Sequence, residues 1–178
     1  MFVQEAELSS QRRLGASEAQ ILHLQSNIAG SYKHQGRLDE SLAMIHAVYS
    51  GYLRLKGEAH EHTLIAANNL AASLRYFQRF EEIRSLMRKT IPLARRAFGD
   101  NDENTLRMRW NYAAALSRDT GATLDDLTEA VETLESLAPL WKRIFGKAHP
   151  ETPNIDLALE IAREKLAESR ASSGSPPS

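Results

Sequence analysis

Apolar residues recur at intervals of three and four along the chain, and two such stripes follow each other in its middle. The first stripe runs from Leu64 through Leu70 and Leu74 to Phe77, which predicts a helix of about 15 residues. The second, longer stripe consists of Phe80, Ile83, Leu86, Met87, Ile91, Ala94 and Phe98. Because the junction between the stripes is very short, the two helices are expected to be antiparallel.

The arrangement repeats with a period of 42 residues, marked by Gly15, Gly57 and Gly99, and Gly146 follows after 47. Glycine adopts the left-handed conformation at a helix end without a steric penalty, so each of these glycines predicts the end of a longer helix. An asparagine keeps the same 42-residue spacing, and we expect its side chain to form hydrogen bonds between helices. Its three copies are Asn27, Asn69 and Asn111.

Two helices per period cannot bury both of their apolar faces alone, so neighbouring pairs are expected to stack into a solenoid with one continuous core. The sequence therefore predicts an all-α fold, an α-solenoid of about three antiparallel helix pairs. A half repeat is expected at residues 1–15, followed by three pairs at about 16–57, 58–99 and 100–146. A capping helix is expected at about 150–168 and a disordered tail at 169–178.

Composition restricts the classes of partner. The chain has 178 residues, a formal net charge of −1 and no cysteine. This balance provides no general attraction to nucleic acid or to an anionic membrane, and no apolar run approaches the roughly 20 residues that span a bilayer. The absence of cysteine excludes disulfide bonds and thiolate metal sites. Together with the lack of a recognisable signal peptide, it favours a cytoplasmic location.

The segment before the second helix pair carries His60 and His62 among carboxylates, which suggests either a metal site or a turn. A metal would need further ligands close by. At the corresponding junctions the chain carries Glu18, Asp102 and His149, which is the variation expected of a turn. Because a glycine-rich phosphate loop and a cysteine nucleophile are also absent, we expect no metal, no cofactor and no enzymatic activity.

These landmarks resemble tetratricopeptide repeats of the long, 42-residue type found in kinesin light chains. The matching motifs are Gly57-Glu-Ala-His60, Thr63, Ala67-Asn-Asn-Leu-Ala71, Arg79-Phe-Glu-Glu82 and Phe145-Gly-Lys-Ala-His-Pro150. The resemblance covers about residues 1–168. It implies a right-handed superhelix in which the first helix of each pair lines a concave groove and the second lies outside. In the kinesin-light-chain branch the first asparagine of the motif helps to hold an extended peptide, and that residue is Asn68 here.

Helical spacing extends this expected groove to neighbouring positions. The residues predicted to bind a peptide are Asn68, Arg75, Lys33, Ser26, Arg107, Trp110 and Arg118. The cations among them suit carboxylates or phosphates, so one hypothesis is an acidic or phosphorylated peptide. The alternative is that they form a solvated face on closely packed helices. Trp110 is expected either to anchor a partner or to pack under the capping helix.

The outward-facing helices carry opposite charges. Basic residues on the first of them are Arg84, Arg88, Lys89, Arg95 and Arg96, and acidic residues on its successor are Asp125, Asp126, Glu129, Glu132 and Glu135. We expect adjacent helices of opposite sign to pair with each other and not to recruit nucleic acid.

The sequence therefore predicts a module that binds a protein or peptide partner, without a nucleic-acid or membrane partner. Two alternatives stay open. In the first, the chain is a regulatory or structural segment of a larger signalling protein. In the second, it is a scaffold that forms homo-oligomers through the N-terminal half repeat, whose apolar stripe comprises Phe2, Ala6 and Leu8.

Overall fold

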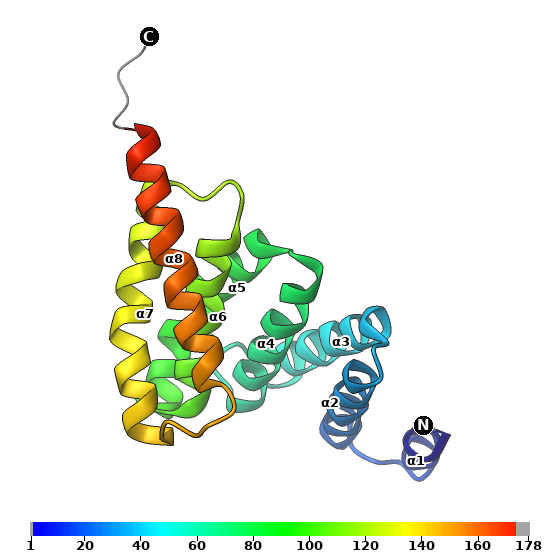
Figure 1. Ribbon diagram of the computed structural model, residues 1–178. Coiled ribbons are helices and arrows are strands. Elements are labelled where there is room, and N and C mark those ends of the chain that lie inside the picture. The colour runs from blue at the N-terminus through cyan, green and yellow to red at the C-terminus, as the bar shows by residue number, and fades with distance from the viewer. Residues whose placement is uncertain (1, 174–178) are drawn as a thin grey trace.

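The computed structural model describes residues 2–173, and the side chains of residues 5–172. Within residues 2–173 every regular element is a helix (Figure 1), which confirms the predicted all-α class. The elements are α1 (Phe2–Arg13), α2 (Glu18–His34), α3 (Leu38–Lys56), α4 (Glu61–Leu74), the 3-10 helix η1 (Arg75–Phe77), α5 (Phe80–Phe98), α6 (Glu103–Arg118), α7 (Leu124–Phe145) and α8 (Thr152–Ser173).

Consecutive helices pack against each other from α1 to α8, and α6 packs in addition against α4 and α8. The helices α4, α6 and α8 thus form one layer (Figure 1). A second layer consists of α5, which packs on α4 and α6, and α7, which packs on α6 and α8. This staggered stacking is that of an α-solenoid, in which each pair buries the apolar face of the next.

Glycine ends the longer helices, as the spacing predicts. Gly57, Gly99 and Gly146 follow α3, α5 and α7 with φ of 83°, 96° and 83°. This region of backbone conformation costs glycine no Cβ clash. The turn between α2 and α3 uses Gly36 in the same way (φ 76°), whereas the turn between α4 and α5 places Gln78 there (φ 55°).

In each of the junctions before α4, α6 and α8, one side chain accepts a hydrogen bond from the backbone. His60, Asp102 and His149 each accept a hydrogen bond from the backbone N–H two residues further on, at 3.2, 2.8 and 3.2 Å. At α4 and α6 these bonds satisfy a donor that the helix leaves unpaired in its first turn, whereas Glu151, which donates to His149, belongs to the turn before α8. Within the part of the chain that the structure describes, no three His, Asp or Glu side chains are grouped to hold a metal ion. Residues 58–60 form the predicted turn, and His60 caps the helix that follows it.

One continuous apolar core runs through the solenoid, from Leu22 in α2 to Leu166 in α8. Trp141 of α7 is among its fully buried members. The Trp141 indole contacts the Phe145 ring, with centroids 4.5 Å apart, and the His149 ring at 5.3 Å. The core therefore joins the end of α7 to the turn that leads into α8.

The N-terminal helix differs from the prediction. Leu8 was expected on an exposed stripe, but it is buried in a small cluster with Ile28 and Tyr32 of α2. A leucine covered by α2 is not available to a second copy of the chain. Ala6 is exposed, and the side chain of Phe2 lies outside the described side chains.

The C-terminal helix is longer than expected. The sequence predicts an end at residue 168 and disorder from residue 169, but α8 continues to Ser173. The Ser172 hydroxyl donates a hydrogen bond of 2.9 Å to the Glu168 carbonyl, one turn earlier in the same helix. The rest of the predicted disordered tail, residues 174–178, lies outside the described residues.

Opposite charges on α5 and α7 pair across the outer layer. Arg84 Nη2 lies 2.9 Å from Asp126 Oδ1, and Arg88 Nη2 lies 3.7 Å from Glu129 Oε2. The predicted pairing of these two helices is confirmed at these positions. The charges on this part of α5 thus stabilise the stacking of the two pairs.

Candidate functional site

Two cavities are lined mainly by the first helix of each pair and by the start of α8. The larger, of about 310 Å³, is lined by Arg75, Tyr76, Trp110, Arg118, Asn154 and Leu157. The smaller, of about 140 Å³, is lined by Ser26, Ala29, Gly30, Lys33, Ser41, Ile45, Asn69, Ala72 and Ser73. Lys33 links them, because its Nζ lies 5.4 Å from the centroid of the Tyr76 ring. We call the two cavities together the inner groove.

Most of the residues predicted to bind a peptide line this groove. Ser26 and Lys33 of α2 lie in the smaller cavity. Arg75, Trp110 and Arg118, from η1 and α6, lie in the larger one. The structure thus brings together side chains that are far apart in the sequence, since they come from α2, η1 and α6.

Arg75 is the best-defined cation of the larger cavity. Its guanidinium lies over the Trp110 ring, 4.6 Å from the centroid, and its Nη1 is 3.5 Å from Asn111 Oδ1. Trp110 itself is only 7% exposed. Of the two expectations for this residue, packing within the solenoid is therefore the one observed, and the indole supports Arg75 by a cation–π contact.

The larger cavity concentrates positive charge. Arg75 is half-buried, and this burial, followed by the nearby Arg118 guanidinium, lowers the pKa of Arg75. Among the described residues, no carboxylate lies within ion-pair distance of Arg75, Arg118 or Lys33. An anion placed between the two guanidiniums would relieve both their repulsion and the cost of desolvating Arg75.

The two adjacent asparagines of α4 lie the other way round from the prediction, with Asn68 in the helix interface and Asn69 on the cavity. Asn68 is 6% exposed, and its Oδ1 accepts a hydrogen bond of 2.9 Å from Asn111 Nδ2. Asn69 is half-buried and lines the smaller cavity. Neighbouring positions on a helix differ by about 100° in direction, so a shift of one residue in phase moves a side chain from the groove into the helix interface.

The repeated asparagines also differ among themselves. Asn111 bonds between helices, as predicted. Asn27 is exposed and its Nδ2 contacts only His23, one turn earlier in the same helix, at 3.5 Å. Asn27 lies near the end of the solenoid, where no earlier pair stacks against α2 within the described residues. The prediction of an interhelical bond is therefore wrong for Asn27.

Arg107 also departs from the prediction of a cation available to a ligand. Its Nη2 lies 2.8 Å from Glu103 of its own helix, and its Nη1 lies 3.0 Å from Glu151, just before α8. Two carboxylates already neutralise this guanidinium. Arg107 therefore fastens α6 to the start of α8.

Sequence reasoning missed Tyr76, Asn154 and Leu157. Tyr76 and Leu157 are 51% and 48% exposed, so they add apolar surface to the larger cavity. A signal for Leu157 was present, because it follows Thr152 at the same spacing at which Trp110 follows Thr105. Treating α8 only as a cap concealed that its first turns line the groove.

Comparison with known proteins agrees with this architecture. The tetratricopeptide repeat family profile matches residues 18–95. The crystal structure of BtubC (BKLC) from P. vanneervenii is similar over 99% of this chain and 79% of that chain, with a TM-score of 0.55 and 14% sequence identity. No curated protein sequence matches the chain. Tetratricopeptide repeats are helical scaffolds that are typically non-catalytic and generally serve as protein–protein interaction modules.

Proposed function

We propose that this chain, which contains tetratricopeptide repeats, binds an extended segment of a partner protein in the inner groove and anchors an acidic side chain of that segment on Arg75 and Arg118. The observation that carries the proposal is the pair of guanidiniums on one cavity, without a described carboxylate against them. Arginine is suited to this role because its planar fork can hold both oxygens of a carboxylate or phosphate.

The remaining lining residues fit a peptide around that anchor. Tyr76 and Leu157 offer exposed apolar surface for a neighbouring side chain. Asn69 and Ser26, in the smaller cavity, offer an amide and a hydroxyl that can bond to a peptide backbone. Gly30 and Ala72 lie beside them, and their small side chains leave room for a peptide backbone to approach. An extended segment that runs from one cavity to the other would pass Lys33.

Substituting Arg118→Glu is expected to weaken binding of such a segment by tenfold or more. The new carboxylate would repel the acidic anchor and would also pair with Arg75. The matched control is Arg96→Glu, the same change at an exposed position of α5. The amount of each partner captured from a native lysate is compared between wild type and the two variants. Peptides from these partners are then titrated against the protein in two forms, with the acidic anchor residue intact or replaced by Asn or Gln. Equal binding by wild type and Arg118→Glu, with unchanged circular dichroism, would exclude the inner groove.

Membrane attachment through a spanning helix is not part of this proposal. Within residues 2–173, no helix combines the length and apolar character needed to cross a bilayer.

A further inference from the structure

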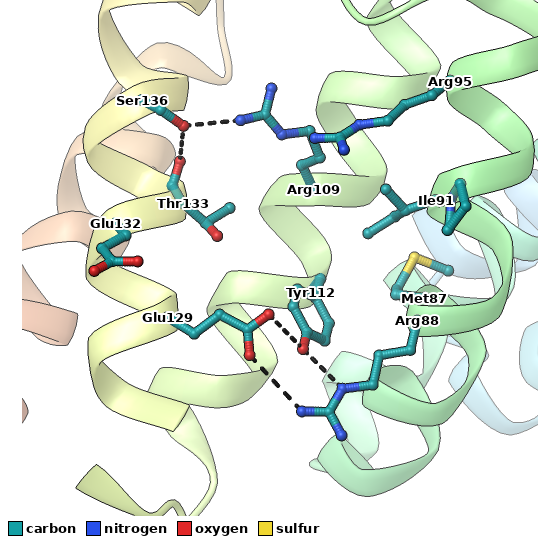
Figure 2. A pocket seen from close by; sticks show the side chains of 11 residues that line it. Met87, Arg88, Ile91, Arg95, Arg109, Tyr112, Glu129, Glu132, Thr133 and Ser136 are labelled. Atoms are coloured by element: carbon teal, nitrogen blue, oxygen red, sulfur yellow. Dashed lines mark hydrogen bonds and ion pairs between the residues drawn. The ribbon is translucent and has the colours of Figure 1, made fainter. Parts of the chain in front are cut away.

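A second cleft lies on the other layer of the solenoid, between α5 and α7, with α6 as its floor (Figure 2). Its volume is about 420 Å³, which is within the usual range for sites that hold a ligand or an anchoring side chain. Met87, Ile91 and Pro92 line it along α5, and Arg109 rises from α6. We call this site the outer cleft.

One end of the outer cleft is closed by a satisfied network. Arg88 Nε donates to the Tyr112 hydroxyl at 2.9 Å, and that hydroxyl donates to Glu129 Oε1 at 3.0 Å (Figure 2). Each member has its partner, so this end serves to hold α5, α6 and α7 together. A ligand would gain little by displacing these bonds.

The other end holds a cation that is only partly satisfied. Arg109 is half-buried, and its Nη2 donates to the neutral Ser136 hydroxyl at 2.8 Å. Ser136 in turn donates to the carbonyl of Thr133 at 2.8 Å (Figure 2). No ion pair joins Arg109 to any described carboxylate, and the nearby Arg95 already lies 3.0 Å from Asp100. Burial, followed by the charge of Arg95, lowers the pKa of Arg109.

We propose that the outer cleft is a second docking site, for a partner segment in which one acidic side chain is flanked by an apolar one. The acidic group would bind Arg109 in the place now taken by the Ser136 hydroxyl. The apolar side chain would cover Ile91 and Pro92, the apolar lining residues of α5 that solvent reaches. Glu132 on the rim disfavours a run of acidic residues, so this motif differs from the acidic segment of the inner groove.

The test is selection from a displayed random-peptide library against the full chain carrying Arg118→Glu, which closes the inner groove. Selected peptides are expected to combine one Asp or Glu with a neighbouring large apolar residue. Their affinity is then measured for Ser136→Asp and Ser136→Asn variants of the same chain. Because the new aspartate would pair with Arg109 and occupy its place, Ser136→Asp is expected to weaken binding about tenfold or more. Ser136→Asn carries a neutral side chain of the same size as the new aspartate, so it controls for the filled space, and it is expected to bind the peptides about tenfold or more tightly than Ser136→Asp.

Thermal unfolding supplies an independent readout. Ser136→Asp is expected to raise the midpoint relative to Ser136→Asn, since it provides the missing counter-charge, so a loss of binding cannot be ascribed to a damaged fold. Absence of the acidic-apolar motif among the selected peptides would overturn the proposal. Equal binding by Ser136→Asp and Ser136→Asn would overturn it as well. Neither result bears on the inner groove, which the Arg118→Glu background removes from the experiment.

Discussion

Replacing Trp141 by alanine is expected to lower the free energy of unfolding by about 3–5 kcal/mol, the usual cost of removing a large buried aromatic side chain. Trp141 is fully buried and contacts Phe145 and His149 at the turn into α8. The cavity left behind would loosen the joint between α7 and α8. Since α8 supplies Asn154 and Leu157 to the inner groove, peptide affinity is expected to fall with stability.

Urea unfolding followed by circular dichroism measures this effect. The matched control is Ile144→Ala on the same helix, where the side chain is 39% exposed. That change is expected to cost less than about 1 kcal/mol, because the Ile144 side chain is already partly in water and alanine has the higher helix propensity. A loss of less than about 1 kcal/mol for Trp141→Ala would show that α7 and α8 are not joined by a tightly packed core at this point.

Substituting Asp126→Asn is expected to cost about 2 kcal/mol at neutral pH. Asp126 is 7% exposed. Its Oδ2 accepts from the Thr123 backbone N–H and hydroxyl at 3.0 and 2.8 Å, and its Oδ1 lies 2.9 Å from Arg84. The amide would interrupt this helix cap and leave half-buried Arg84 with only the more distant Glu81 and Asp119, at 3.6 and 3.7 Å.

The same substitution predicts a pH dependence. Burial favours the neutral form of Asp126, but the Thr123 hydrogen bonds and the Arg84 and Arg88 guanidiniums outweigh it, so the pKa of Asp126 is lowered. A carboxyl whose folded pKa lies below its unfolded value, about 3.9, contributes stability above that value and loses it as the pH falls through the folded pKa. The stability difference between wild type and Asp126→Asn should therefore be constant near neutrality and shrink below about pH 4.

Asp125→Asn is the control for this experiment, because Asp125 is the exposed neighbour of Asp126 in the first turn of α7. It is expected to change stability by less than about 0.5 kcal/mol. If Asp126→Asn and wild type unfolded at the same urea concentration at neutral pH, the bonds around Asp126 would not stabilise the stacking of α5 and α7.

The helices and their ends could be predicted from the sequence because both depend on local chemistry. Apolar spacing gave the stripes, and Gly57, Gly99 and Gly146 gave the helix ends. The serine-rich composition after residue 168 predicts disorder, but α8 continues to Ser173 and the Ser172 hydroxyl bonds within the helix. Composition alone does not show that a helix already anchored by its apolar stripe can continue for another turn.

The candidate site was predicted less completely because it depends on contacts between distant segments. Arg107 is not available to a ligand because it pairs with Glu151, which lies 44 positions further along the chain. Trp110 is buried in a solenoid layer that includes α8. The placement of Asn68 and Asn69 was predicted from the resemblance and from the 42-residue spacing, whereas it depends on how α4 packs against α6, where Asn68 bonds to Asn111.

The central claim, that a partner segment lies in the inner groove with its acidic side chain on Arg75 and Arg118, is tested most directly by site-specific photo-crosslinking. A photoreactive phenylalanine analogue is placed at Tyr76, on the larger cavity, or at Arg96, on the exposed side of α5. With the same bound partner, the proposal predicts a covalent product from position 76, mapped next to an Asp, Glu or phosphorylated residue, and none from position 96. Products from position 96 alone, or equally from both positions, would contradict it.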